Sequence, residues 1–439
     1  MSFRPLLSSY KFIPEALTSI PLAIQSGVYI TPVEVTKAYN IPSSTGFGVT
    51  IGVISLGGGF LQSDLDKSMS DLGLQSPSIN FISISSATNN FNADSSNLQN
   101  PVSFSIENTL DIFCIASMVP DATINIYIAS PNFSVRDQIV SDFNAAVQQA
   151  TNDGCDIIAI SWGTDELGDN AQPGGDVFDT VFATAEASGI TIFVASGDYG
   201  SFNPVVDNSV NKNLAIAPLY PASSSRVVAV GGTYLTVNSD GSRNTEYAAQ
   251  NSGGGISRII PVPQWQNNLI YNTYPVTTPT TLIQYQVNQT TRIGRGVPDL
   301  SAPFFNYVFY FNGSLITASG TSASCPVIAG MFARFIAMNH KQRPSYGAST
   351  FMSKLYANMS TAFYNKTLDK AVTLSGQPTN NNAAKSPYGG YLATANSWNP
   401  VTGLGVPNGR IVYRLTGISG QTFPYKKSSR PTSGIAYPR

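Results

Sequence analysis

Between residues 46 and 232 the chain alternates short apolar runs with helical stretches, and this alternation limits the fold more than any other feature. Six runs rich in β-branched residues are predicted strands: residues 48–56, 79–85, 122–130, 156–163, 190–198 and 226–233. Helical patterns lie between several of them, at residues 105–119, 135–153 and 176–189. Nearly continuous apolar strands belong in a sheet that is covered on both faces. The pattern therefore predicts one large α/β domain with a doubly wound, mostly parallel sheet.

The composition excludes several classes of partner. Only 11% of the 439 residues are charged, and 24 basic side chains balance 25 acidic ones. No charge pattern for nucleic acid or an anionic membrane is present, and no apolar run approaches the length of a membrane span. The three cysteines are scattered and odd in number, which predicts neither a disulfide framework nor a zinc site.

A serine at the start of a predicted helix is the first candidate for catalysis. In residues 319–326 a glycine turn delivers Ser322 to a helix N-terminus, whose N–H groups suit a developing oxyanion. Pro326 is expected in the first turn, where its missing N–H costs nothing. Alone, these residues fit an ordinary helix cap better than a catalytic site. The only histidine, His340, lies roughly 27 Å further along a continuous helix, so serine chemistry here needs another base.

Acidic side chains can supply that base. Glu107 and Asp111 stand at i and i+4 of a predicted helix and face the same direction. Two close carboxylates relieve their repulsion by sharing one proton, which suits a relay where Glu107 takes the proton of Ser322 and Asp111 orients Glu107. The alternative is that both residues only stabilise the helix, because acidic side chains in its first turns interact favourably with the helix dipole. The apolar neighbours leave little solvent face, so we expect the pair to be at least partly buried.

A third carboxyl follows a predicted strand directly. Asp198 comes after residues 190–197, at the carboxyl edge where open α/β sheets place their sites. A neutral carboxylic acid there can donate a hydrogen bond to an oxyanion, whereas an ionised one repels it. The alternative is an aspartate that closes a turn with its own backbone, as in many Gly-Asp-x-Gly sequences.

Together these motifs resemble the sedolisin (serine-carboxyl peptidase) family, whose fold is subtilisin-like. The resemblance runs from about residue 29 to residue 412 and rests on an ordered set of motifs. These are residues 30–42, 107–111, 159–166 (AISWGTDE), 195–200 (ASGDYG), 220–233, 251–257 (NSGGGIS), 294–303, 318–326 (ASGTSASCP) and 398–409. Each motif alone is weak, but the set in this order is specific.

The resemblance implies a role for each candidate. Ser322 is implied as nucleophile, Glu107 as base, Asp111 as its partner, and Asp198 as oxyanion donor beside the N–H of Ser322. Residues implied to bind an extended peptide by backbone pairing are Ser161, Trp162, Gly163, Gly253, Gly254 and Gly255. The implied activity is that of an acid-acting endopeptidase or tripeptidyl-peptidase on peptide or protein substrates. Ionised Glu107 and protonated Asp198 coexist most easily below neutrality.

The chain also departs from the family pattern. Asn399 stands where the calcium motif has an aspartate, and residues 365–376 align poorly with the upstream calcium segment. We therefore expect at most weak Ca²⁺ binding, since affinity follows ligand charge, and no cofactor for the chemistry. Tyr199 replaces the usual serine after Asp198 and is expected to reshape the primed side or the wall of the first specificity pocket.

The ends of the chain suggest a division into three parts. Residues 1–29 are expected to form a peripheral extension shorter than the family's prodomain, residues 30–416 the peptidase domain, and residues 417–439 a basic tail. The family implies a secreted or acidic setting, although no signal peptide is visible. The alternative is a catalytically silent sedolisin-like protein that serves as a binding or structural component inside a cell or a virus particle.

Overall fold

The computed structural model describes most of the chain in separate stretches. These are residues 3–13, 29–97, 100–166, 177–204, 214–267, 273–274, 294–339, 348–364, 368, 371–372, 378–379, 390–391 and 393–416. His340 and the expected tail at 417–439 lie outside the described residues.

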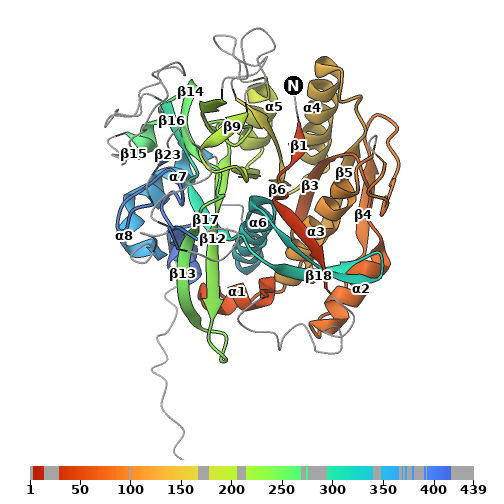
Figure 1. Cartoon of the computed structure of the whole chain (residues 1–439), viewed down its shortest axis with the longest axis horizontal. Helices are drawn as coiled ribbons and strands as arrows, with labels where there is room; N and C mark the ends of the chain where they lie inside the picture. Colours follow the sequence, from red (N-terminus) through yellow and green to blue (C-terminus); the bar gives the residue numbers. More distant parts are fainter. Residues whose placement is uncertain are drawn as a thin grey trace, which may run out of the picture.

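One large sheet forms the centre of the molecule (Figure 1). Its strands lie in the order β22-β21-β13-β12-β8-β6-β3-β5-β4, and β17 pairs with β12. The strands from β12 to β4 run parallel. Their bounds are β3 Thr50–Leu56, β4 Ile79–Ser83, β5 Thr123–Ala129, β6 Ile157–Ile160, β8 Thr191–Ala195, β12 Val228–Val237, β13 Arg243–Ala249, β17 Leu300–Pro303, β21 Ala371–Val372 and β22 Pro378–Thr379. The predicted doubly wound α/β sheet is confirmed, and the predicted strand at 156–163 divides into β6 and β7 (Trp162–Asp165).

Helices cover both faces of this sheet and so explain the nearly continuous apolar runs. In β6, Ile157 and Ala159 belong to one core, whereas Ile158 and Ile160 belong to the other. The first core includes α3 (Val102–Met118) and α6 (Thr321–Met338), and the second includes α4 (Arg136–Asn152) and α5 (Asp179–Ala187). Because alternate side chains of a strand point to opposite faces, both sets must be apolar.

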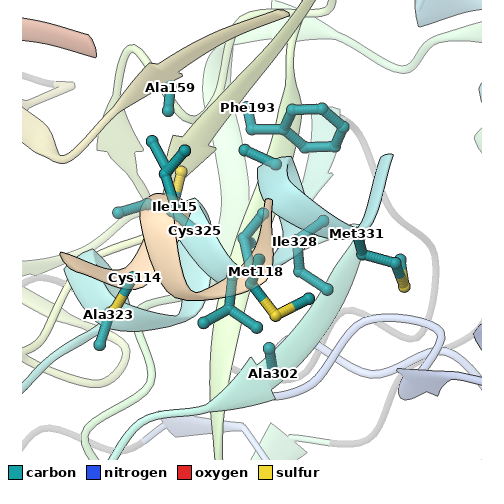
Figure 2. Packing of buried hydrophobic residues seen from close by; sticks show 14 of the residues in the cluster. Cys114, Ile115, Met118, Ala159, Phe193, Ala302, Ala323, Cys325, Ile328 and Met331 are labelled. Atoms are coloured by element: carbon teal, nitrogen blue, oxygen red, sulfur yellow. The ribbon is translucent and has the colours of Figure 1, made fainter. Parts of the chain in front are cut away.

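The packing of α3 against α6 sets the position of the site. Figure 2 shows side chains of both helices meeting Ala159, Phe193 and Ala302 of the sheet. A Cβ atom on Gly330 of α6 would come within 2.5 Å of the Met118 side chain of α3, so glycine permits this close crossing. All three cysteines are buried and free. In the described part of the chain, α6 is the one helix long and apolar enough to span a membrane, but most of it is buried in this core.

The winding of the sheet reverses between β3 and β6. From β3 the chain continues to β4 and β5 on one side, and then from β6 to β8 and β12 on the other. In open α/β sheets, the space beyond the carboxyl ends of the strands at such a point holds the ligand. Ser161 follows β6 there, and Asp198 follows β8 after two intervening residues.

The N-terminal segment, residues 3–13, crosses this carboxyl edge. Its strand β1 (Arg4–Pro5) pairs antiparallel with β7, and β2 (Ser9–Phe12) pairs antiparallel with β19 (Ser314–Ser319). Figure 1 shows β1 in red near the N-terminal mark, between α5 and α4 in this view. The expectation that residues 1–29 are peripheral is therefore wrong for residues 3–13. Strands of two and four residues are too short to show a hydrophobic period, and the unpaired edges of β7 and β19 become visible only in the folded chain.

Smaller elements complete the domain. They are α1 Pro32–Ala38, α2 Gln62–Asp71, β9 Phe202–Pro204, β10 Leu214–Ile216, β11 Leu219–Tyr220, β14 Gly255–Pro261, β15 Thr273–Tyr274, β16 Gly294–Val297, β18 Tyr307–Phe311, α7 Ala348–Ala357, α8 Met359–Ala362, β20 Phe363–Tyr364, β23 Gly390–Tyr391, β24 Val406–Pro407 and α9 Gly409–Leu415.

Candidate active site

The structure brings the four predicted catalytic residues into one buried region. Glu107 and Asp111 come from α3, Asp198 follows β8, and Ser322 lies in the first turn of α6. Their exposed fractions are 0%, 1%, 2% and 0%. The expected burial of the carboxyl pair is thus confirmed. Three acidic groups in so dry a region need a strong compensating interaction or a bound proton.

Gly320 allows the serine and Asp198 to approach each other. A Cβ atom on Gly320 would lie 2.7 Å from Asp198 Oδ2 and 2.8 Å from Ser322 Oγ, which no side chain could tolerate. The glycine that precedes α6 therefore leaves open the space into which both polar atoms point. Both atoms border this space.

Glu107 lies beside Ser322 without a settled hydrogen bond. Neither carboxyl oxygen of Glu107, nor Ser322 Oγ, makes a hydrogen bond of regular geometry among the described residues. Burial raises the pKa of Glu107 well above its usual value, the charges of Asp111 and Asp198 raise it further, and the nearby Ser322 hydroxyl opposes the shift. Hydrogen bonds between nucleophile and base are often long before substrate binds, so this geometry is compatible with proton transfer.

Asp111 is held by the hydroxyl of Ser161. Burial raises the pKa of Asp111 well above its usual value, while a hydrogen bond from Ser161 Oγ to Asp111 Oδ1, 2.7 Å long, lowers it. Since burial dominates for both carboxyls, the pair retains at least one proton to a higher pH than isolated acids do.

The position of Pro326 in α6 differs from the prediction. Pro326 is the sixth residue of α6, not part of its first turn, so it cannot give the carbonyl of Ser322 the usual helical N–H. Ser161 Oγ, whose proton is directed mainly to Asp111, lies 3.4 Å from that carbonyl oxygen. Ser161, predicted only as part of a peptide-binding segment, thus lies between Asp111 and the backbone of Ser322.

Asp198 binds the start of α6. Its Oδ1 accepts hydrogen bonds from the backbone N–H of Thr321 at 2.7 Å and from Thr321 Oγ1 at 2.8 Å. Thr321 Oγ1 in turn accepts from the N–H of Gly197 at 3.0 Å. The carboxyl therefore caps a distant helix rather than its own turn, and Oδ1 is fixed so that Oδ2 lies toward Ser322. Sequence reasoning missed Thr321, although its position directly before the candidate nucleophile was a usable signal.

The first predicted peptide-binding segment does hold an extended chain, namely residues 3–13 of the protein itself. Gly163 and Trp162 of β7 pair with Arg4 and Pro5, and the carbonyl of Ser161 accepts from the N–H of Leu6 at 2.8 Å. No sequence pattern indicated this occupant.

The second predicted peptide-binding segment, residues 253–255, is hydrogen-bonded to other segments of the same domain. Its N–H groups at Gly253 and Gly254 donate to the carbonyls of Gly197 and Gly200, and Gly255 pairs with Val297. Its role toward a peptide stays a prediction.

Asn399 does not fit a calcium ligand in this fold. Its Oδ1 accepts hydrogen bonds from the N–H groups of Val401 and Thr402, both 3.0 Å long, and its Nδ2 donates to the carbonyl of Thr394 and to Thr402 Oγ1. Every polar position of the amide is used within this local turn. No group of three or more metal-binding side chains occurs among the described residues, although most of residues 365–376 lies outside them.

We therefore expect chelation to leave the fold unchanged. Removing divalent cations with EDTA should lower Tm by less than about 2 °C, because a neutral amide already saturated by the backbone adds little cation affinity. Differential scanning calorimetry with and without added Ca²⁺ measures this. A large drop on chelation, reversed by Ca²⁺, would show that oxygens elsewhere in the chain hold the ion.

Stability is expected to increase toward acid. A carboxyl whose pKa is higher in the folded than in the unfolded chain contributes stability that is complete below the unfolded pKa and is lost as pH rises through the folded pKa. Burial raises the pKa of both Glu107 and Asp111. We therefore predict a Tm that is several degrees higher at about pH 4 than at about pH 8. Replacing the pair by Gln and Asn should flatten this dependence, and an unchanged dependence would show that other groups cause it.

Comparisons with known proteins agree with this fold and arrangement. The family model described as "Subtilase family" matches residues 85–377. The chain is 30% identical over 405 residues to kumamolisin from Bacillus sp. (strain MN-32), covering 90% of this chain and 65% of that protein. It is 30% identical over 237 residues to the probable tripeptidyl-peptidase SED3 of Trichophyton verrucosum, covering 54% of this chain and 37% of that one.

A solved structure supports the fold. Pseudomonas sedolisin, described as a serine-carboxyl proteinase in complex with pseudo-iodotyrostatin, superposes with a TM-score of 0.63 at 23% identity, covering 89% of this chain and 98% of that one.

The chain belongs to the subtilase family. Within that class, the resemblance to the sedolisins is confirmed by kumamolisin, the SED relatives and the sedolisin fold. The chain spans about two thirds of the length of kumamolisin and about a third of the SED3 relative.

Proposed function

We propose that the chain is a serine-carboxyl peptidase that cuts an extended peptide, with Ser322 as nucleophile. The observation that carries the proposal is the convergence of Glu107, Asp111 and Asp198 on one buried serine at the start of a helix. The named activities of kumamolisin, the SED tripeptidyl-peptidases and the sedolisin support the same reaction. No comparison supports the catalytically silent alternative.

The proposed chemistry assigns one task to each group. Ser322 Oγ attacks the carbonyl carbon of the peptide and passes its proton to Glu107, while Asp111 orients Glu107. The oxyanion takes hydrogen bonds from the N–H of Ser322 and from protonated Asp198 Oδ2. Glu107 then gives its proton to the leaving amine as the C–N bond breaks. Water repeats the sequence on the acyl-enzyme and frees Ser322.

The proposed reaction needs two opposite protonation states, so its rate should pass through a maximum as the pH changes. Glu107 must be ionised and Asp198 neutral at the same time, and the buried pair loses its last proton at a raised pH. The rate should therefore fall at high pH, when Asp198 loses its proton, and at low pH, when Glu107 gains one.

We further infer an endopeptidase rather than a tripeptidyl-peptidase. Residues 3–13 enter the site with three residues, Arg4, Pro5 and Leu6, before the bond nearest Ser322, and the chain continues to Phe3. Phe3 is 5% exposed and packs against Phe143 and Phe178, with ring centres 5.6 and 6.0 Å apart. A cleft that ended after three residues would have no room for this fourth side chain.

Two substrates test the function. A quenched peptide is incubated with the protein at about pH 4 and about pH 8, and the protein's own N-terminus is followed by mass spectrometry. We expect hydrolysis of the added peptide in acid, a new N-terminus at Leu7, and labelling of Ser322 by a fluorophosphonate probe. Absence of all three at both pH values would reject the peptidase and favour a silent binding protein.

A further inference from the structure

The register of residues 3–13 identifies the bond that faces the nucleophile. The carbonyl oxygen of Leu6 accepts the N–H of Ser322 at 3.3 Å. It also lies 2.5 Å from the Cβ position of Gly320, the same point that Asp198 Oδ2 and Ser322 Oγ surround. Beyond it, the N–H of Ser8 donates to the carbonyl of Ser319 at 2.8 Å. The peptide bond between Leu6 and Leu7 thus occupies the position of a bond to be cut.

Each side chain before this bond lies against a distinct surface. Leu6 is 1% exposed and lies over Gly163 beside Leu219; a Cβ atom on Gly163 would be 3.2 Å from Leu6 Cδ1. Phe3 occupies the aromatic surface formed by Phe143 and Phe178. These contacts are apolar and would accept many similar side chains, so they discriminate weakly.

Arg4 makes the one charged contact described in this register. Its Nη2 lies 4.0 Å from Asp165 Oδ1, and its guanidinium carbon lies 4.4 Å from the centre of the Tyr199 ring. The Asp165 side chain is 9% exposed and that of Arg4 is 26% exposed. Burial raises the pKa of Asp165 to about 6, while the charge of Arg4 lowers it. A buried carboxylate without a cation is costly, so an occupant that brings one is favoured.

We propose that Asp165 and Tyr199 form a subsite that selects an arginine or lysine side chain two residues before the residue whose carbonyl Ser322 attacks. The carboxylate supplies charge from a dry wall, and the ring supplies a face over which a cation can lie. The subsite assigns a role in substrate binding to Tyr199, which stands where the family motif has a serine. The sequence predicted an effect of Tyr199 on the primed side or the wall of the first pocket, whereas its ring lies against Arg4, two residues before Leu6. The proposal rests on the proposed peptidase function.

The alternative is that Arg4 and Asp165 form an ordinary surface ion pair that only anchors residues 3–13 to the domain. Such a pair would differ from the observed contact in burial and in alignment. A fully solvated ion pair adds little affinity because water screens it and two side chains lose freedom. Here the carboxylate is buried, and the segment is aligned by backbone hydrogen bonds on both sides of Leu6. The cation is therefore presented to a fixed partner, as a specificity pocket requires.

Turnover of matched peptides tests the selection. The substrates are Phe-Arg-Pro-Leu-Leu-Ser-Ser-Tyr and the same peptide with glutamine or glutamate in place of the arginine. At a pH well above 6, where Asp165 is ionised, we expect kcat/KM to be about tenfold higher for the arginine peptide than for the glutamine peptide, and lowest for glutamate. The ratio is independent of how much enzyme its own segment blocks, since both peptides compete with it equally.

Variants separate the two groups of the subsite. Asp165→Asn should remove most of the preference, and Tyr199→Ser should reduce it about threefold, whereas Tyr199→Phe keeps the ring and should retain it. Asp137→Asn removes an acidic side chain that is 94% exposed and serves as the charge control. An equal rate for all three peptides, or a preference that survives Asp165→Asn, would overturn the proposal.

A second measurement needs no catalysis. In the Ser322→Ala protein, hydrogen exchange of residues 3–8 reports how tightly the segment is held. Arg4→Gln and Asp165→Asn should each speed this exchange several-fold, and the double variant no more than either alone. Independent, additive effects would reject the Arg4–Asp165 contact. Coupling without any turnover by the parent protein would instead reject the peptidase function and leave a peptide-binding subsite.

Discussion

Replacing Glu107 by glutamine is expected to reduce kcat by about 10⁴-fold or more, and Ser322→Ala should reduce it by a similar factor. Glutamine has the shape of the carboxyl but cannot take a proton, so Ser322 Oγ would have to attack while still protonated. His340 is outside the described residues, and the sequence contains no other imidazole that could replace the base. Single-turnover hydrolysis of a quenched peptide in acid measures the loss.

The double variant supplies the sharper result. If Glu107 and Ser322 act as one unit, Glu107→Gln in the Ser322→Ala background should cost nothing further. Both variants should keep the fold, because each replaces a buried polar side chain by one of equal or smaller size without charge. A protein that retains most of its activity as Glu107→Gln would require another base and would remove Glu107 from the mechanism.

The sheet could be predicted because its strands carry a strong signal. Burial on both faces makes the central strands nearly continuous in apolar residues, and six apolar runs stand out along the chain. The pairing of β1 with β7 could not be predicted. It joins only Arg4 and Pro5 to an edge strand, and its stability depends on the whole domain, not on local pattern.

The candidate site was only partly visible in the sequence. Spacing on one helix indicated Glu107 and Asp111, and the end of a strand indicated Asp198. The partners of these groups were not visible. Ser161 and Thr321 donate to carboxyls supplied by distant segments, and such hydrogen bonds follow from the packing of α3, α6 and the sheet. The spacing of residues in the sequence does not predict that packing.

The buried acids also link stability to chemistry. Three carboxyls buried this deeply and this close together would destabilise the fold if all were ionised, and bound protons offset this cost. The same shared protons are those that the proposed reaction moves. A site of this kind is therefore expected to gain stability as the pH falls.

Asp198→Ala is expected to lower kcat by about 10²- to 10³-fold while changing KM little, as for the loss of other oxyanion donors. The carboxyl is held by Thr321 through Oδ1, which leaves Oδ2 beside the Leu6 carbonyl oxygen that the N–H of Ser322 also binds. A donor at Oδ2 stabilises charge that exists only in the transition state, so its loss affects the rate rather than binding.

Asp198→Asn is the matched control. An amide can accept from Thr321 through its oxygen and still donate through its nitrogen, at every pH. We therefore expect most of the activity to return in this variant and the decline at high pH to disappear, because asparagine has no proton to lose. Rate profiles for the parent, Asp198→Ala and Asp198→Asn between about pH 3 and pH 8 distinguish the cases. If alanine were as active as the parent, or asparagine as poor as alanine, Asp198 would have a role in holding α6 and none toward the oxyanion.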